Sequence, residues 1–134
     1  ANEESEESLP EDGRGDPREQ RIRHLLRLAN FQRNRGNLQD AESNYLAVLD
    51  LDRDNARALA GLARLHMARG SNGQALRWAR RLVAARPRNA ANHVLLGDVL
   101  EANGNRRAAA ASWRRALELS PGLRSAQQRL ARGR

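Results

Sequence analysis

The side chains best suited to catalysis or metal binding in this sequence are three histidines, His24, His66 and His93. No two of them stand at the spacing that places a chelating pair on one turn of a helix. The chain contains no cysteine, which excludes a thiolate metal site and a cysteine nucleophile within it. Lysine is also absent, so a Gly-Lys-Ser/Thr phosphate-binding loop and a Schiff-base lysine are excluded as well.

Three aspartates suggest the other common kind of metal site, a calcium-binding loop. Asp50, Asp52 and Asp54 alternate along the chain at the expected end of a helix. The segment lacks the glycine and the distal glutamate of an EF-hand, so we expect these carboxylates to cap the helix or face solvent. No serine lies in a Gly-x-Ser-x-Gly pattern. We therefore predict no enzymatic activity, no metal and no cofactor.

The composition indicates which elements hold these side chains. Of the 134 residues, 23 are Ala, 20 are Leu and 24 are Arg, whereas Val, Ile and Thr together number five. Ala, Leu and Arg favour helices, and strands require β-branched and aromatic residues, so an all-α fold is predicted. The unbroken apolar stretches are about four or five residues long, far short of the ~20 that a membrane span needs.

Charge divides the chain into two parts. Residues 1–19 contain eight acidic side chains and two arginines, whereas residues 20–134 contain 22 arginines and eight acidic side chains. The first part has almost no apolar side chains to offset the entropy of the chain, so we predict a disordered acidic arm or linker over 1–19 and a folded domain over 20–134. The alternative is that the arm competes for a basic groove on the folded domain, as a built-in pseudo-ligand.

An internal repeat of fixed period organises the folded part. Gly36, Gly70 and Gly104 are 34 residues apart, and each lies between two amphipathic stretches of about 13 residues. Glycine permits the tight turn between antiparallel helices, so each unit is predicted to be a helical hairpin. We expect Leu28 and Ala29, with their counterparts, to form the apolar stripe of the first helix. The same period relates Ala41, Ala75 and Ala109; Leu28, Leu62 and Leu96; Tyr45, Ala79 and Trp113; and Pro87 and Pro121.

This pattern resembles the tetratricopeptide repeat. The leucine-plus-small pair, the turn glycine, the alanine early in the second helix, the aromatic residue after it and the closing proline all belong to that family's signature. Three units fit, at 22–55, 56–89 and 90–123, and residues 124–132 are similar to the capping helix that often closes such an array. The resemblance implies an all-α, right-handed α-solenoid of antiparallel helix pairs, with a concave groove lined by the first helix of each unit.

Departures from the family pattern predict local differences in packing. His66 and His93 stand where the family packs aromatic rings, so we expect both histidines to be semi-buried packing residues. Ala79 stands where Phe or Tyr is common, and Trp78 precedes it. We interpret Trp78 as a local repacking of the second unit, with an exposed binding anchor as the alternative.

The resemblance also implies which side chains face the groove, and it favours a partner with acidic character. Guanidinium groups pair bidentately with carboxylates, and the implied lining is basic in the first two units and ends in an acidic spot at Asp98 and Glu101. The alternative is that the many arginines reflect only a preference of the coding sequence for Arg over Lys. The predicted partner-binding residues are Arg23, Leu26, Arg27, Asn30, Arg57, Arg64, Met67 and Asp98.

One specialised function of the family can be tested on the residues. Some members clamp the acidic tail of heat-shock chaperones with two lysines, two asparagines and an arginine at fixed places. Of these places only Asn30 carries the required residue type; the others hold Leu26, Gly61, Ala91 and Leu95. Clamping of a chaperone tail is therefore not expected.

We predict an adaptor or scaffold that binds a partner peptide or helix in the groove. The alternative is sequence-independent nucleic-acid binding through arginines on the outer, convex face, at positions 77, 80, 81, 106, 107, 114 and 115. Against that alternative, few aromatic residues are available for base stacking. The absence of cysteine and the arginine-only basic set fit a bacterial, cytoplasmic protein, and the oligomeric state is not predicted.

Overall fold

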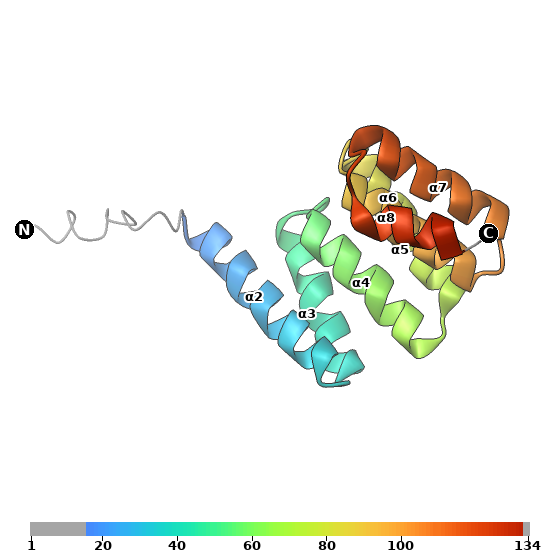
Figure 1. Cartoon of the computed structure of the whole chain (residues 1–134). Helices are drawn as coiled ribbons and strands as arrows, with labels where there is room; N and C mark the ends of the chain where they lie inside the picture. The colour runs from blue at the N-terminus through green and yellow to red at the C-terminus, as the bar shows by residue number, and fades with distance from the viewer. Residues whose placement is uncertain (1–15, 133–134) are drawn as a thin grey trace, which may run out of the picture.

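The computed structural model describes residues 16–132, and within that range it contains seven helices and no strand (Figure 1). The all-α prediction is confirmed. The helices are α2 (Pro17–Asn34), α3 (Leu38–Leu51), α4 (Ala56–Arg69), α5 (Asn72–Ala85), α6 (Ala90–Ala102), α7 (Arg106–Leu119) and α8 (Arg124–Arg132). No helix within residues 16–132 is long and apolar enough to span a bilayer.

The helices form three successive hairpins, α2–α3, α4–α5 and α6–α7, with α8 packed on α7 (Figure 1). The first helix of each later unit also touches the first helix of the unit before it, so α4 contacts both α2 and α6. Helices α4, α6 and α8 begin at Ala56, Ala90 and Arg124, which follow the same period as the turn glycines. The molecule is an α-solenoid in which the first helices line one side.

Glycine turns and asparagine caps fix the ends of the helices. Gly36, Gly70 and Gly104 have φ of 82°, 81° and 85°, in the left-handed region that side chains with a Cβ rarely adopt. Each lies between the two helices of a unit, as the sequence period predicts. At the helix starts, the side chains of Asn55 and Asn89 accept hydrogen bonds from the third backbone N–H that follows.

The helix α2 begins earlier than the sequence indicated. Its N-cap is Asp16, whose Oδ1 accepts a hydrogen bond of 2.7 Å from the backbone N–H of Glu19, and Pro17 occupies the first turn. The helix therefore includes residues 17–19, which the sequence assigned to the arm or linker. Residues 1–15, which make up the rest of the predicted acidic arm, lie outside the described residues.

The core consists of three apolar clusters, each shared between one hairpin and the next helix along the chain. The first cluster joins α2 and α3 to α4, the second joins α4 and α5 to α6, and the third joins α6 and α7 to α8. Each unit thus completes the core of its neighbour, which is how repeat arrays gain stability.

The predicted apolar stripe of the first helices is buried only where a preceding unit covers it. Leu62 is fully buried and Leu96 is half-buried, but Leu28 is 37% exposed. This position packs against the unit before it, and no unit precedes α2 among the described residues. Leu28 therefore stays partly exposed on α2, whereas Ala29 is fully buried.

Candidate partner-binding groove

On the side lined by the first helices, a cavity of about 510 Å³ lies between α2, α4 and α6. Its lining is polar and basic, with four arginines and three asparagines. We call it the basic cavity. It is lined by Asn30, Arg33, Ala56, Arg57, Ala60, Arg64, Arg86, Asn89 and Asn92.

A second cavity of about 350 Å³, the mixed cavity, continues the groove between α4, α6 and α8. One part of its lining is apolar, from Met67, Ala91, Val94 and Leu95, and the rest is polar, from Arg64, Asp98, Ser125 and Arg129. Arg64 lines both the basic and the mixed cavity and therefore stands at their junction.

A third hollow of about 290 Å³ lies at the start of α2, where α2 meets the loop between the first two units. It brings together Arg23, Leu26 and Arg57, three of the predicted binding residues. Leu26 is only 4% exposed, so it forms part of the wall. Arg57 also lines the basic cavity, and the three hollows therefore follow one another along the groove.

Arg64 differs from the residues that occupy its place in the other units. Asn30 accepts a hydrogen bond from the hydroxyl of Tyr45, and Asp98 accepts one of 3.2 Å from Nε1 of Trp113. The second unit has Ala79 in place of the ring, so its second helix offers Arg64 no such partner. Arg64 forms no hydrogen bond or ion pair with any residue that the structure describes.

The surroundings of Arg64 disfavour its positive charge. Partial burial lowers the pKa of its guanidinium, and the charge of Arg33 lowers that pKa further, whereas Tyr45 and Asp98 act in the opposite direction. Arginine nevertheless stays protonated near neutral pH. The groove therefore holds at its centre a cation that forms no direct ion pair within the described part of the chain, although the charge of Asp98 favours it.

The predicted acidic spot at the end of the groove is already paired with arginines of α8. Nε and one terminal nitrogen of Arg129 donate to the two oxygens of Asp98 at 2.5 and 2.9 Å, and Arg132 donates to Glu101 at 3.0 Å. This bidentate contact uses both carboxylate oxygens of Asp98. Asp98 lines the mixed cavity, but its carboxylate holds α8 in place.

The other predicted residues take different positions. Asn30, Arg57, Arg64 and Met67 line the basic or the mixed cavity, whereas Arg27 is exposed on α2 and lines none of these three hollows. Sequence reasoning missed three lining residues that belong to or flank the loop before α6: Arg86, Asn89 and Asn92. The helix-start position of Asn89 was the only signal that could have drawn attention to this loop.

The histidines and Trp78 pack as predicted. His66 and His93 are 3% and 8% exposed, and Nε2 of His93 lies 2.7 Å from the backbone oxygen of Pro87. Trp78 is half-buried against the first two clusters, with the guanidinium of Arg81 at 5.1 Å from its ring. Residues 16–132 contain no group of three or more His, Cys, Asp or Glu that could hold a metal ion.

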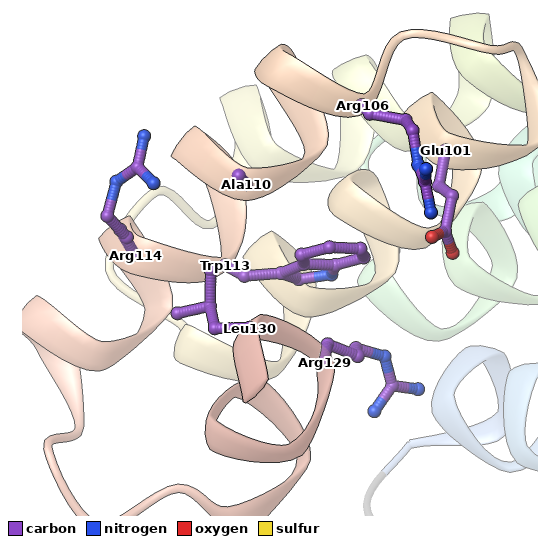
Figure 2. Close-up of a pocket in the computed structure, with 7 residues that line it drawn as sticks. All are labelled: Glu101, Arg106, Ala110, Trp113, Arg114, Arg129 and Leu130. Atoms are coloured by element: carbon purple, nitrogen blue, oxygen red, sulfur yellow. The ribbon is translucent and has the colours of Figure 1, made fainter. Parts of the chain in front are cut away.

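A further cavity, of about 370 Å³, lies between α6, α7 and α8 and shares Arg129 with the mixed cavity. Figure 2 shows the indole of Trp113 at the centre of its lining, with Arg106 and Glu101 toward one side and Arg114 extending away on the other. Trp113 is only 4% exposed, so its ring serves mainly to pack α7 against α6 and α8.

Comparison with known proteins identifies the repeat. Two family models described as "Tetratricopeptide repeat" match residues 32–96 and 90–123. The chain belongs to the tetratricopeptide repeat family. Members of this family generally serve as non-catalytic modules that bind other proteins, so the fold supports binding of a partner protein.

Solved structures of similar fold include a mutant of the O-GlcNAc transferase of Thermobaculum terrenum. It is 34% identical with a TM-score of 0.78, over 87% of this chain and 22% of that one. The first tetratricopeptide domain of Spaghetti (RPAP3), bound to an HSP90 peptide, is 20% identical with a TM-score of 0.77, over 84% of this chain and 90% of that one. This second likeness shows the fold alone.

Among curated proteins, the Cellulose synthase 1 operon protein C of Komagataeibacter xylinus is 44% identical over 50 residues. That match covers 37% of this chain and 4% of the longer protein. The chain therefore spans only a small part of this relative and of the glycosyltransferase.

Proposed function

We propose that this domain is an adaptor that docks an acidic segment of a partner protein in the groove lined by α2, α4 and α6. The observation that carries the proposal is Arg64, a partly buried cation at the junction of two cavities that forms no hydrogen bond or direct ion pair with the described residues. A carboxylate bound there would complete its hydrogen bonding and relieve the repulsion from Arg33.

The other side chains of the basic cavity support the same ligand chemistry. Arg33, Arg57 and Arg86 line it together with Arg64, and none of the four is paired with a carboxylate among the described residues. Clustered like charge in a hollow attracts ligands of the opposite sign and speeds their association. Asn92 also lines this cavity, although its Nδ2 atom is buried and has no hydrogen-bond partner within residues 16–132.

The test uses a fluorescent acidic peptide, for example a six-residue oligoglutamate, and the intact chain. Fluorescence anisotropy should show binding that the pair Arg57→Glu and Arg64→Glu weakens by at least tenfold. The matched control is Arg77→Glu with Arg107→Glu, which changes net charge equally on the outer helices. An equal loss of affinity in both double variants would show that only net charge matters, and would overturn the proposal.

A second experiment identifies the partner. Affinity capture with the two double variants, followed by mass spectrometry, compares the proteins that each one retains.

The second candidate function is nucleic-acid binding through the outer helices. Arginines 77, 80, 106, 107 and 114 are exposed and form no hydrogen bond or ion pair with described residues, whereas Arg81 and Arg115 are paired with Asp54 and Glu118. A titration with random-sequence oligonucleotides across a salt series separates the two functions. Tight binding at physiological salt with a steep dependence on salt favours nucleic acid, whereas binding lost well below that concentration favours protein docking.

A further inference from the structure

The outer edge of α2 and its C-cap residue carry a stripe of five exposed side chains: Arg21, His24, Leu28 and Phe31 in the helix, and Arg35 at the C-cap. Steps of three and four residues place them on one face of the helix. We call this set the α2 stripe. Its centre is apolar, with Leu28 at 37% and Phe31 at 60% exposure, and an arginine stands at each end.

The same positions in later units are contacts between units. Ala58, Leu62 and Leu65 stand one sequence period after His24, Leu28 and Phe31, and all three are fully buried in the cluster that joins α4 to α2 and α3. Farther along, Val99 and Ala126 at the equivalent positions are also fully buried, whereas Asn92 and Leu96 are half-buried. The α2 stripe therefore has the pattern of a surface that packs on helices, and no helix covers it among the described residues.

We propose that the α2 stripe docks an amphipathic helix of a partner protein, with aliphatic side chains on one face and acidic side chains flanking them. A helix is the occupant because the equivalent stripe of α4 is covered by the helices α2 and α3. This surface is separate from the groove, so the domain would hold two partner segments at once.

The charge of the α2 stripe indicates that the docked helix carries acidic side chains. The stripe has no acidic member, and the guanidinium of Arg35 stands 5.6 Å from the ring of Phe31, beside the apolar centre. A carboxylate on each flank of the incoming helix would meet Arg21 and Arg35, at the rim where such contacts set specificity and association rate.

The same charge disfavours a second copy of this chain as the occupant. Self-association through the stripe would bring these arginines against themselves, in a domain with 22 arginines and eight acidic residues over 20–134. The chain's own residues 1–15 are acidic, but Leu9 is their only large apolar side chain, so they lack the means to cover Leu28 and Phe31.

The test is a titration of the isotope-labelled intact chain, followed by backbone NMR spectra, with two designed helical peptides. Both carry leucines at heptad spacing; one is flanked by glutamates and the other by lysines. We expect the acidic peptide to shift the resonances of α2 around Leu28 and Phe31, and Phe31→Glu to weaken its binding at least tenfold. Leu46→Glu is the matched control, since Leu46 is 40% exposed on α3 at a place equivalent to the exposed Arg80.

Three outcomes would overturn the proposal. Equal affinity for the lysine-flanked peptide would contradict the inference that the docked helix carries acidic side chains. Shifts confined to residues around Arg57 and Arg64 would place the peptide in the groove, and would leave the proposed groove function standing. Sedimentation that shows a dimer of the chain, abolished by Phe31→Glu, would assign the stripe to a second copy instead. If Arg21→Glu lowers the affinity for the acidic peptide and raises the affinity for the lysine peptide, the pairing of acidic flanks with the arginines of the stripe is confirmed.

Discussion

The phenol ring of Tyr45 occupies the space that a side chain at residue 61 would need. A Cβ added to Gly61 would lie 2.3 Å from two ring carbons of Tyr45, far inside van der Waals contact. Tyr45 is fully buried, and its hydroxyl also donates to Asn30. The ring therefore fixes the distance between α3 and α4, the contact between the first two units.

We predict that Gly61→Ala destabilises the protein by about 1–3 kcal/mol, the usual cost of overpacking. This expected loss of stability is opposite to the usual result, because replacing a glycine within a helix by alanine normally stabilises a protein by about 0.5–1 kcal/mol. Gly73 is the matched control because it also lies in a helix and a Cβ there would meet nothing within 4 Å. Urea unfolding of both variants measures the difference; a Gly61→Ala variant as stable as Gly73→Ala would contradict the close approach.

The pair of Asp98 and Arg129 predicts that α8 depends on one carboxylate. Asp98 accepts hydrogen bonds from Arg129 and Trp113, so Asp98→Ala leaves two donors without their acceptor. We expect a loss of about 1–3 kcal/mol in the free energy of unfolding, with α8 exchanging its amide protons first. The control is Glu118→Ala, whose partner Arg115 is exposed, and an exposed ion pair contributes about 0–1 kcal/mol. Equal small losses would show that α8 is held by apolar contacts alone.

The sequence period made the hairpins and the glycine turns predictable, because it reports contacts that recur in every unit. It could not describe features that do not recur in each unit. Leu28 carries the residue type of a buried position but is covered by no residue that the structure describes, and the helix start at Asp16 depends on a local cap within the acidic segment.

The sequence period also could not predict contacts between side chains that are not repeated from unit to unit. The acidic spot at Asp98 was expected to face a ligand, because a spacing argument does not reveal that Arg129 lies opposite it on α8. Arg86 and Asn89 were missed for a related reason. The period assigns them to a loop, and only the packed structure shows that this loop borders the basic cavity.

The acidic N-terminal segment is predicted to weaken the binding of acidic ligands to the groove. Residues 1–15 carry six acidic side chains and one arginine, and a tethered polyanion competes at a high effective concentration. In the full chain, replacing Glu3, Glu4, Glu6 and Glu7 with Gln should raise the affinity for the oligoglutamate peptide severalfold at low salt. The gain should vanish in high salt, where screening shortens the Debye length to a few Å. An unchanged affinity at low salt would favour a simple linker, and Glu118→Gln serves as the control.

His66 predicts that the protein loses stability as the pH falls below neutral. Burial lowers the pKa of its imidazole, and Arg69 lowers it further, against the opposing effect of Glu42, whose Oε2 lies 3.3 Å from Nε2. Nδ1 is buried without a hydrogen-bond partner among the described residues, which fits the neutral ring.

In the unfolded chain His66 binds a proton near its usual pKa of about 6.5, whereas in the folded protein it resists protonation. The unfolded state then binds more protons, so the free energy of unfolding decreases between pH 7.5 and 5.5. His66→Leu should flatten this dependence, and the third unit already has Leu100 at the equivalent position. His24→Gln, which removes an exposed imidazole from α2, is the control variant. Urea unfolding at both pH values provides the measurement, and a slope that survives in His66→Leu would contradict the role of His66.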